Sequence, residues 1–153
     1  MKQKYTPLKY AIYIAVGLIS YFLFLSIWGL HIHPVYGILN LIIMATGMFL
    51  MIKNYKKEKG PHFKYQKGFW AIFRCGMVST IIFTAFFALY NAINPLFFEE
   101  LIPMWETEYF ANIGDLIITI ALIGFATSIT LALTYMQLFK RSWNTKDGNK
   151  HTF

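Results

Sequence analysis

Charged side chains are scarce in this sequence. Lys, Arg, Asp and Glu together make up 14% of the 153 residues, whereas hydrophobic residues make up 57% and the mean hydropathy is +0.47. A soluble domain carries roughly 25% charged residues. The composition therefore excludes an ordinary water-soluble fold and indicates that much of the protein surface faces lipid.

Cysteine is almost absent as well. Cys75 is the only cysteine, which excludes an intrachain disulfide framework and a paired-cysteine metal site. The sequence also contains no Walker loop, dinucleotide-binding glycine motif, HExxH zinc motif or nucleophile elbow, which are typical of nucleotide-driven proteins and hydrolases. We therefore expect Cys75 to be a packing residue, and the protein to be non-enzymatic and to hold no cofactor.

Apolar residues occur in four long stretches. About 20 apolar residues in a helix cross the hydrocarbon core of a bilayer, which is roughly 30 Å thick, and an exposed non-helical backbone cannot be satisfied inside lipid. We therefore predict an all-α, polytopic membrane protein, with a single four-helix transmembrane domain over residues 1–153 that ends in a polar tail at 140–153. The expected spans are about 10–30, 35–52, 69–94 and 115–139.

Positive charge lies on one side of these four spans. All fourteen Lys and Arg residues fall before the first span, between the second and the third or one turn into the third, and after the fourth. The two other connections, 31–34 and 94–115, contain no Lys or Arg, and 94–115 holds five of the seven acidic residues. The positive-inside rule then predicts that both termini and the 53–67 connection face the cytoplasm. This topology and contact with anionic headgroups explain the net charge of +7, so no nucleic-acid partner is expected.

The middle of the chain carries three linked features. A basic stretch with a tyrosine, 52–60, follows the second span, Phe63 and the pair Gly68-Phe69 lead into the third, and 90–95 reads Tyr-Asn-Ala-Ile-Asn-Pro. This third of the chain resembles DUF4199, an uncharacterised family of small four-helix inner-membrane proteins found mainly in Bacteroidota. The resemblance implies the four-span topology and a bacterial cell inner membrane. It brings no established activity and no catalytic residues.

Arg74 is the one basic residue expected inside a span, about one turn into the third. Lys64 and Lys67 precede it on the cytoplasmic side. Arginine binds phosphate through two parallel hydrogen bonds. Arg74 is therefore interpreted either as a headgroup anchor or, together with Lys67 and Lys64, as a lipid-phosphate site for a phospholipid or a polyprenyl phosphate.

Small and polar residues recur along the spans. On the second span Asn40, Gly47 and Asn54 repeat every seven residues, and the fourth span carries a broader band. This band consists of Gly124, Thr127, Ser128, Thr130 and Thr134. Small residues let helices approach closely and hydroxyls form hydrogen bonds between helices, so the band predicts a packing surface, either within the chain or against a partner. A polar groove for a lipid or a small solute is the alternative.

His31 and His33 lie in the first short connection on the non-cytoplasmic side. The longer connection on the same side carries four glutamates, Glu99, Glu100, Glu106 and Glu108. Imidazole and carboxylate groups are zinc ligands, which makes His31 and His33 weak candidates for a metal site. Nothing in the sequence fixes the distance between the two connections, and we expect no metal.

The centres of the four spans contain no Asp, Glu, Lys, Arg or His. Ion-coupled pumps and transporters place such residues in mid-membrane, so the absence disfavours a proton-coupled exporter. The favoured prediction is a non-catalytic accessory or assembly subunit of a larger inner-membrane complex. Its partners would be membrane lipids and other membrane subunits or a second copy of the chain. The alternative is a membrane protein that binds or transports a lipid or a small solute.

Overall fold

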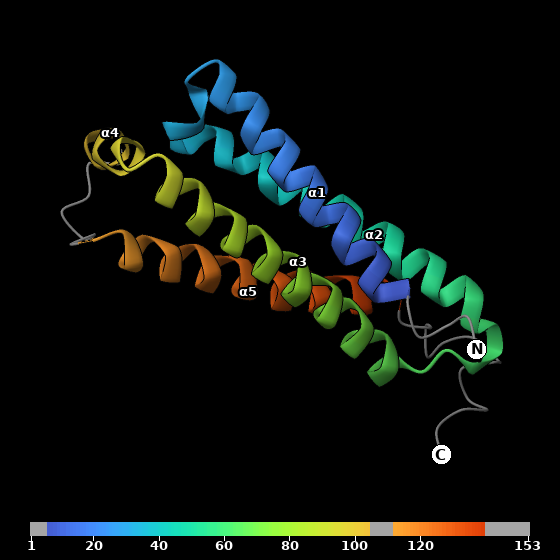
Figure 1. Ribbon diagram of the computed structural model, residues 1–153. Helices are drawn as coiled ribbons and strands as arrows, with labels where there is room; N and C mark the ends of the chain where they lie inside the picture. The colour runs from blue at the N-terminus through green and yellow to red at the C-terminus, as the bar shows by residue number, and fades with distance from the viewer. Residues whose placement is uncertain (1–5, 105–111, 140–153) are drawn as a thin grey trace.

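The computed structural model describes residues 6–104 and 112–139, and within these ranges it is all-helical. Its long helices are α1 (Thr6–Ile27), α2 (Gly37–Lys59), α3 (Tyr65–Ile93) and α5 (Ile113–Leu138), and a shorter helix, α4 (Leu96–Met104), follows α3 (Figure 1). Each of the four long helices is long and apolar enough to cross a membrane. This confirms the all-α class and the four helices that could span a bilayer. The predicted tail at 140–153 lies outside the described residues.

The connections between the first three helices are short. Two 3-10 helices, η2 (Leu30–Ile32) and η3 (Pro34–Tyr36), join α1 to α2, and a third, η4 (Gly60–His62), follows α2. Gly29 and Gly60 adopt positive φ values of 66° and 49° at these turns, a conformation that glycine adopts without steric cost.

α2 extends well beyond the apolar stretch that predicted it. The helix continues past residue 52 and ends at Lys59, and α3 begins at Tyr65. The last turn of α2 holds Lys56, Lys57 and Lys59. Lysines are favourable there because the C-terminal end of a helix carries partial negative charge. The 53–67 connection expected from the sequence is therefore mostly helical.

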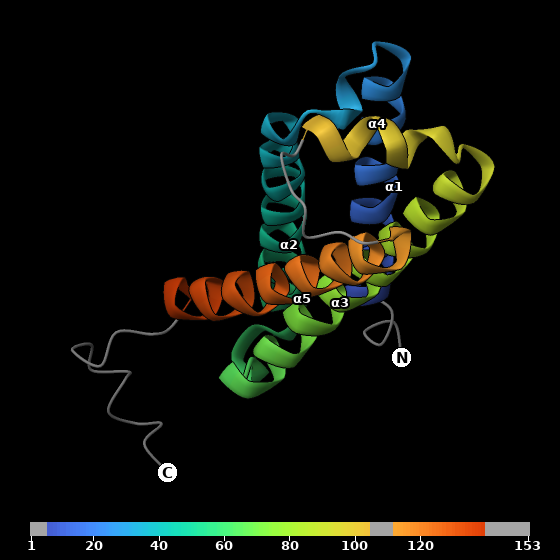
Figure 2. The ribbon, with the colours of Figure 1, turned by 90° about the vertical axis from the view of Figure 1, so that its left-hand side faces the viewer.

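The long helices form two pairs. α1 packs beside α2, α3 packs beside α5, and α3 also contacts α1 (Figure 1). Figure 2 shows that α3 and α5 cross the first pair at a steep angle. The two pairs meet at the end of the bundle where α3 begins and diverge toward the other end, where α4 lies close to η2. This divergence determines where the interior is closely packed.

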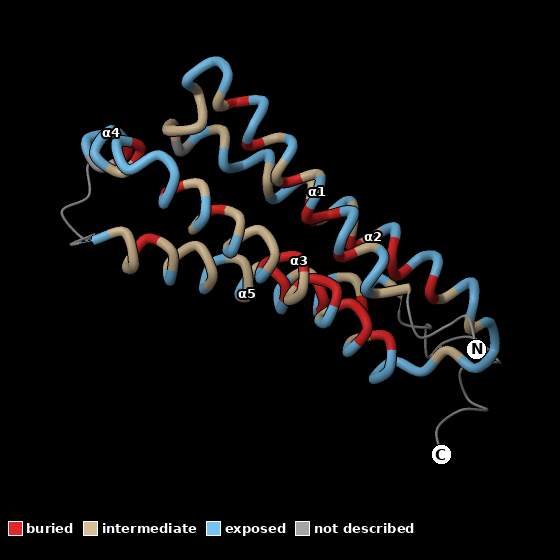
Figure 3. The backbone as a smooth tube through the Cα atoms, viewed as in Figure 1, coloured by how far each residue is buried: buried red, intermediate tan, exposed pale blue. Residues whose placement is uncertain are grey.

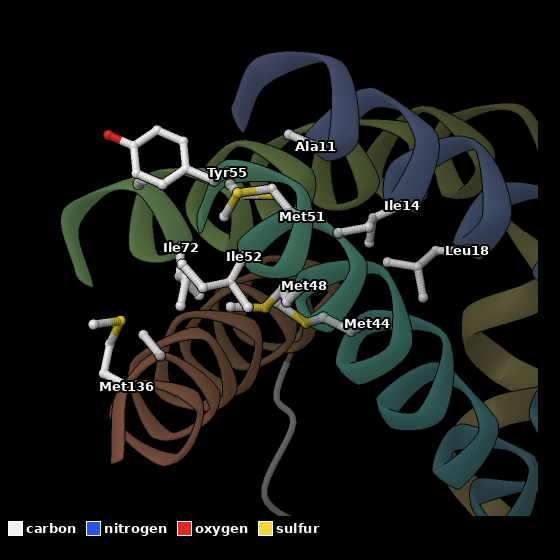
Figure 4. Close-up of a cluster of buried hydrophobic side chains, with 13 residues drawn as sticks. Ala11, Ile14, Leu18, Met44, Met48, Met51, Ile52, Tyr55, Ile72 and Met136 are labelled. Atoms are coloured by element: carbon white, nitrogen blue, oxygen red, sulfur yellow. The ribbon is translucent and has the colours of Figure 1, made fainter. Parts of the chain in front are cut away.

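The larger core cluster lies at the end where the pairs meet. Buried positions of α3 are concentrated in its first half (Figure 3). Three methionines of α2, Met44, Met48 and Met51, fill the centre of this cluster against Ile14 of α1 and Ile72 of α3 (Figure 4). Methionine is unbranched and adapts to irregular gaps. The closely packed half therefore joins all four long helices, since Met136 of α5 belongs to the same cluster.

Small residues bring α3 and α5 together. A Cβ atom built at Gly76 of α3 would lie 2.7 Å from the Cβ atom of Ser128 on α5. One turn along, a Cβ atom at Gly124 of α5 would overlap Thr80 of α3. Such close approach is what glycine permits at helix interfaces in membranes. Gly124 and Ser128, from the predicted band, are therefore used within the chain.

Candidate functional site

A cavity of about 290 Å³ lies between the two helix pairs in the half where they diverge. Its walls come from the last turns of α1, the connection that contains η2 and η3, the start of α2, the second half of α3, α4 and the first half of α5. Most lining side chains are apolar, among them Phe22, Met44, Phe83, Leu116 and Ile120. Ligand pockets are typically about 300–1,000 Å³, mostly apolar, with a few polar groups that orient the ligand. At about 290 Å³, the cavity lies just below the lower end of this range.

Two polar atoms among the cavity-lining residues lack a hydrogen-bond partner within the described part of the chain. They are the Nδ1 atom of His31 and the Oδ1 atom of Asn40, and both atoms are buried. Leaving a buried donor or acceptor unsatisfied costs about 1–3 kcal/mol. A bound molecule would recover this energy where a small side-chain movement brings one of these atoms into contact with it.

Aromatic rings hold His31 at the edge of the cavity. Its imidazole stacks on Phe97 of α4 with a centroid distance of 4.9 Å and meets Phe22 of α1 edge-on at 5.5 Å. The Nε2 atom lies 3.5 Å from the hydroxyl of Tyr90, which is 2.9 Å from the hydroxyl of Ser26. Nε2 therefore faces this hydroxyl pair, whereas Nδ1 has no such neighbour.

Burial also determines the charge of His31. Desolvation lowers the pKa of His31 below its ordinary value of 6.5, and the Glu100 carboxylate on α4 opposes this shift only in part. At neutral pH the ring is therefore mainly uncharged. One of its nitrogens then donates a hydrogen bond and the other accepts one.

Asn40 differs from the other members of its seven-residue repeat on α2. Asn54 donates a hydrogen bond to the hydroxyl of Tyr10 on α1, and Gly47 lets Ile14 of α1 approach closely. Both residues thus serve the contact between α1 and α2. Asn40 instead lines the cavity, and its side-chain oxygen has no partner among the described residues.

The predicted basic cluster lies away from this cavity. Lys64 precedes α3, Lys67 and Arg74 lie in its first half, and all three side chains are exposed. Lys67 and Arg74 are seven residues apart and therefore share one face of the helix. The lining residues of α3 begin only at Thr80. The structure does not bring the basic residues to the cavity, and their role in binding lipid phosphate stays a prediction.

The predicted band on α5 divides into three environments. Gly124 and Ser128 pack against α3. Thr127 lines the cavity, and Gly124 also contributes to its lining. Thr130 and Thr134 are exposed, and each donates its hydroxyl to the backbone carbonyl four residues earlier, at 2.9 and 2.8 Å. These two hydroxyls are thus satisfied within α5 itself.

The weak metal candidates His31 and His33 both line the cavity. Across residues 6–104 and 112–139, no three His, Cys, Asp or Glu side chains are grouped so that they could hold a metal ion. Glu106 and Glu108 lie outside the described residues. Cys75 is fully buried in the larger core cluster, where it packs among apolar side chains.

One feature of the site was missed in the sequence. Phe83, Phe86, Phe87 and Tyr90 of α3 all place their rings against Phe22. Their spacing of three, four and seven residues puts them on one helical face, which is a recognisable pattern. The pattern predicts an aromatic face on the second half of α3, but it does not reveal what that face contacts.

Comparison with protein-family models, curated proteins and solved structures finds no match to this chain. The resemblance to DUF4199 stays a prediction. Function is therefore argued from the cavity and its side chains.

Proposed function

We propose that this chain is a non-catalytic, multi-pass membrane protein that binds a lipid or another small amphiphile in the cavity between its helix pairs. The observation that carries the proposal is a mostly apolar cavity in which His31 and Asn40 each hold a buried polar atom without a partner among the described residues. An amphiphile matches this surface, since its chain contacts the apolar wall and its head supplies hydrogen bonds.

The accessory-subunit interpretation has less support. In that interpretation the band of small and polar residues on α5 packs against a partner. Gly124 and Ser128 are used against α3, and Thr127 lines the cavity. Only Thr130 and Thr134 are left for a partner helix, and their hydroxyls are already bonded within α5. We therefore rank lipid binding above assembly.

Filling the cavity is expected to expel the amphiphile. Thr127→Phe places a ring on the cavity side of α5, and it should lower occupancy by the bound molecule about tenfold, which corresponds to about 1.4 kcal/mol. Occupancy is measured by native mass spectrometry of the protein released from nanodiscs. The matched control is Ala126→Phe, which adds the same ring at the neighbouring, exposed position.

Two outcomes would contradict lipid binding. Equal occupancy in Thr127→Phe and Ala126→Phe would show that the retained lipid sits elsewhere on the protein. Release of the wild-type protein without lipid, but with companion chains in fixed ratio, would replace lipid binding by the accessory-subunit function.

We also propose that both termini face the cytoplasm of a bacterial inner membrane, as the basic residues and the resemblance to DUF4199 imply. In a Cys75→Ala background, an impermeant thiol reagent should label Val35→Cys in intact cells and Lys57→Cys only after permeabilisation. Both positions are exposed, so accessibility within the protein does not bias the comparison. The reverse labelling pattern would invert the topology.

A further inference from the structure

The described residues that line the cavity include no permanently charged side chain. None of them is Asp, Glu, Lys or Arg, and their two imidazoles belong to His33 and to His31, whose pKa is lowered by burial. Burying an ionised group without an opposite charge is costly. The charged group that acts on His31 is Glu100, which would repel an anion. An anionic headgroup therefore meets no Lys or Arg among the described lining residues.

The two unpartnered atoms, Asn40 Oδ1 and His31 Nδ1, also limit which head groups can form hydrogen bonds in the cavity. The Oδ1 atom of Asn40 is an acceptor and needs a donor from the ligand. The Nδ1 atom of His31 donates or accepts, depending on which ring nitrogen carries the proton. A hydroxyl group can satisfy either atom, since it has one donor and two acceptor positions. A carbonyl or an ether only accepts, and it would leave Asn40 unsatisfied.

We infer that the cavity selects an amphiphile with an uncharged hydroxyl head, a lipid alcohol, over an anionic phospholipid or an ether. The inference rests on the proposed function and names the class of molecule that is bound. The hydroxyl donates to the Oδ1 atom of Asn40, and the alkyl chain lies along Phe22, Phe83 and the other apolar lining residues.

Three probes with the same chain separate the head-group chemistries. They are 1-dodecanol, dodecyl methyl ether and dodecyl phosphate, each titrated into the delipidated protein and followed by native mass spectrometry. Only binding that Thr127→Phe weakens is counted as cavity binding. This criterion leaves out dodecyl phosphate bound at the exposed basic residues. We expect 1-dodecanol to bind about tenfold tighter than the ether, because only the alcohol can donate a hydrogen bond to the Oδ1 atom of Asn40. The phosphate should bind more weakly still.

Asn40→Leu tests the role of the amide directly. Because the Oδ1 atom has no partner to lose, the change should leave folding intact. It should reduce alcohol affinity to the level of the ether and leave ether affinity unchanged. Asn54→Leu, on the same helix but outside the cavity lining, is the matched control and should preserve the preference.

The outcomes distinguish the two proposals. Equal cavity binding of all three probes, or tighter binding of the phosphate, overturns the head-group inference and leaves the proposed function standing. An unchanged alcohol preference in Asn40→Leu likewise overturns the assignment of the amide. Absence of any binding that is sensitive to Thr127→Phe overturns both proposals, and the buried polar atoms would then be solvated by water only.

Discussion

Gly76→Ala is expected to lower the free energy of unfolding by about 1–3 kcal/mol, the usual cost of overpacking a closely packed interior. An added Cβ atom would lie 2.7 Å from the Cβ atom of Ser128 on α5. Rotation of the Ser128 side chain moves its hydroxyl but leaves its Cβ atom in place. The clash is therefore relieved only if α3 and α5 separate, which also loosens the contact between Thr80 and Gly124 one turn away.

Reversible unfolding in mixed detergent micelles, followed by circular dichroism, measures this cost. The control is Gly37→Ala, where an added Cβ atom meets nothing within 4 Å. Alanine there should be neutral or slightly stabilising, because it reduces the entropy of the unfolded chain. Ser128→Gly should recover part of the loss in the double variant by removing the opposing atoms. A Gly76→Ala variant as stable as Gly37→Ala would show that the two helices are not held this closely.

The four long helices could be predicted because hydropathy is a local property of the chain. An uncharged run such as 10–30 specifies a helix in lipid irrespective of its neighbours. The helix ends were less accurate, since helical backbone continues past the apolar boundary at residue 52 to Lys59. Hydropathy indicates where lipid would be, whereas local propensity and capping determine where a helix stops.

The cavity could not be predicted, because it depends on contacts between distant parts of the chain. His31 and Phe97 stack on each other although 66 positions separate them, and the sequence left the distance between their connections open. The seven-residue spacing on α2 also predicted the same role for Asn40 and Asn54. In the structure Asn40 lines the cavity, whereas Asn54 forms a hydrogen bond to Tyr10 of α1. The two asparagines have different environments because the helix pairs are far apart near Asn40 and close together near Asn54.

Phe22→Ala is expected to have the largest effect on the half of the bundle that contains the cavity. The Phe22 ring is only 6% exposed. It meets six other rings edge-on, with centroid distances from 5.0 to 6.4 Å, and they come from the turn after α1, from α3 and from α4: His31, Phe83, Phe86, Phe87, Tyr90 and Phe97. Truncation of a buried phenylalanine costs about 3–5 kcal/mol in soluble cores. We expect about 3 kcal/mol here, because lipid reduces the hydrophobic part of this cost and leaves mainly the lost packing.

The loss should be unevenly distributed along the chain, and hydrogen exchange measures where it falls. Phe22, Phe97 and Leu101 belong to one buried cluster, whereas Met48 and Ile52 belong to the other. Amides of α4 should therefore exchange faster in Phe22→Ala, while those of α2 around Met48 keep their protection. Phe24→Ala, two residues away and 59% exposed, should change neither region. Equal loss of protection in both clusters would mean that the bundle opens as one cooperative unit, and α4 would then owe its position to the whole bundle rather than to Phe22.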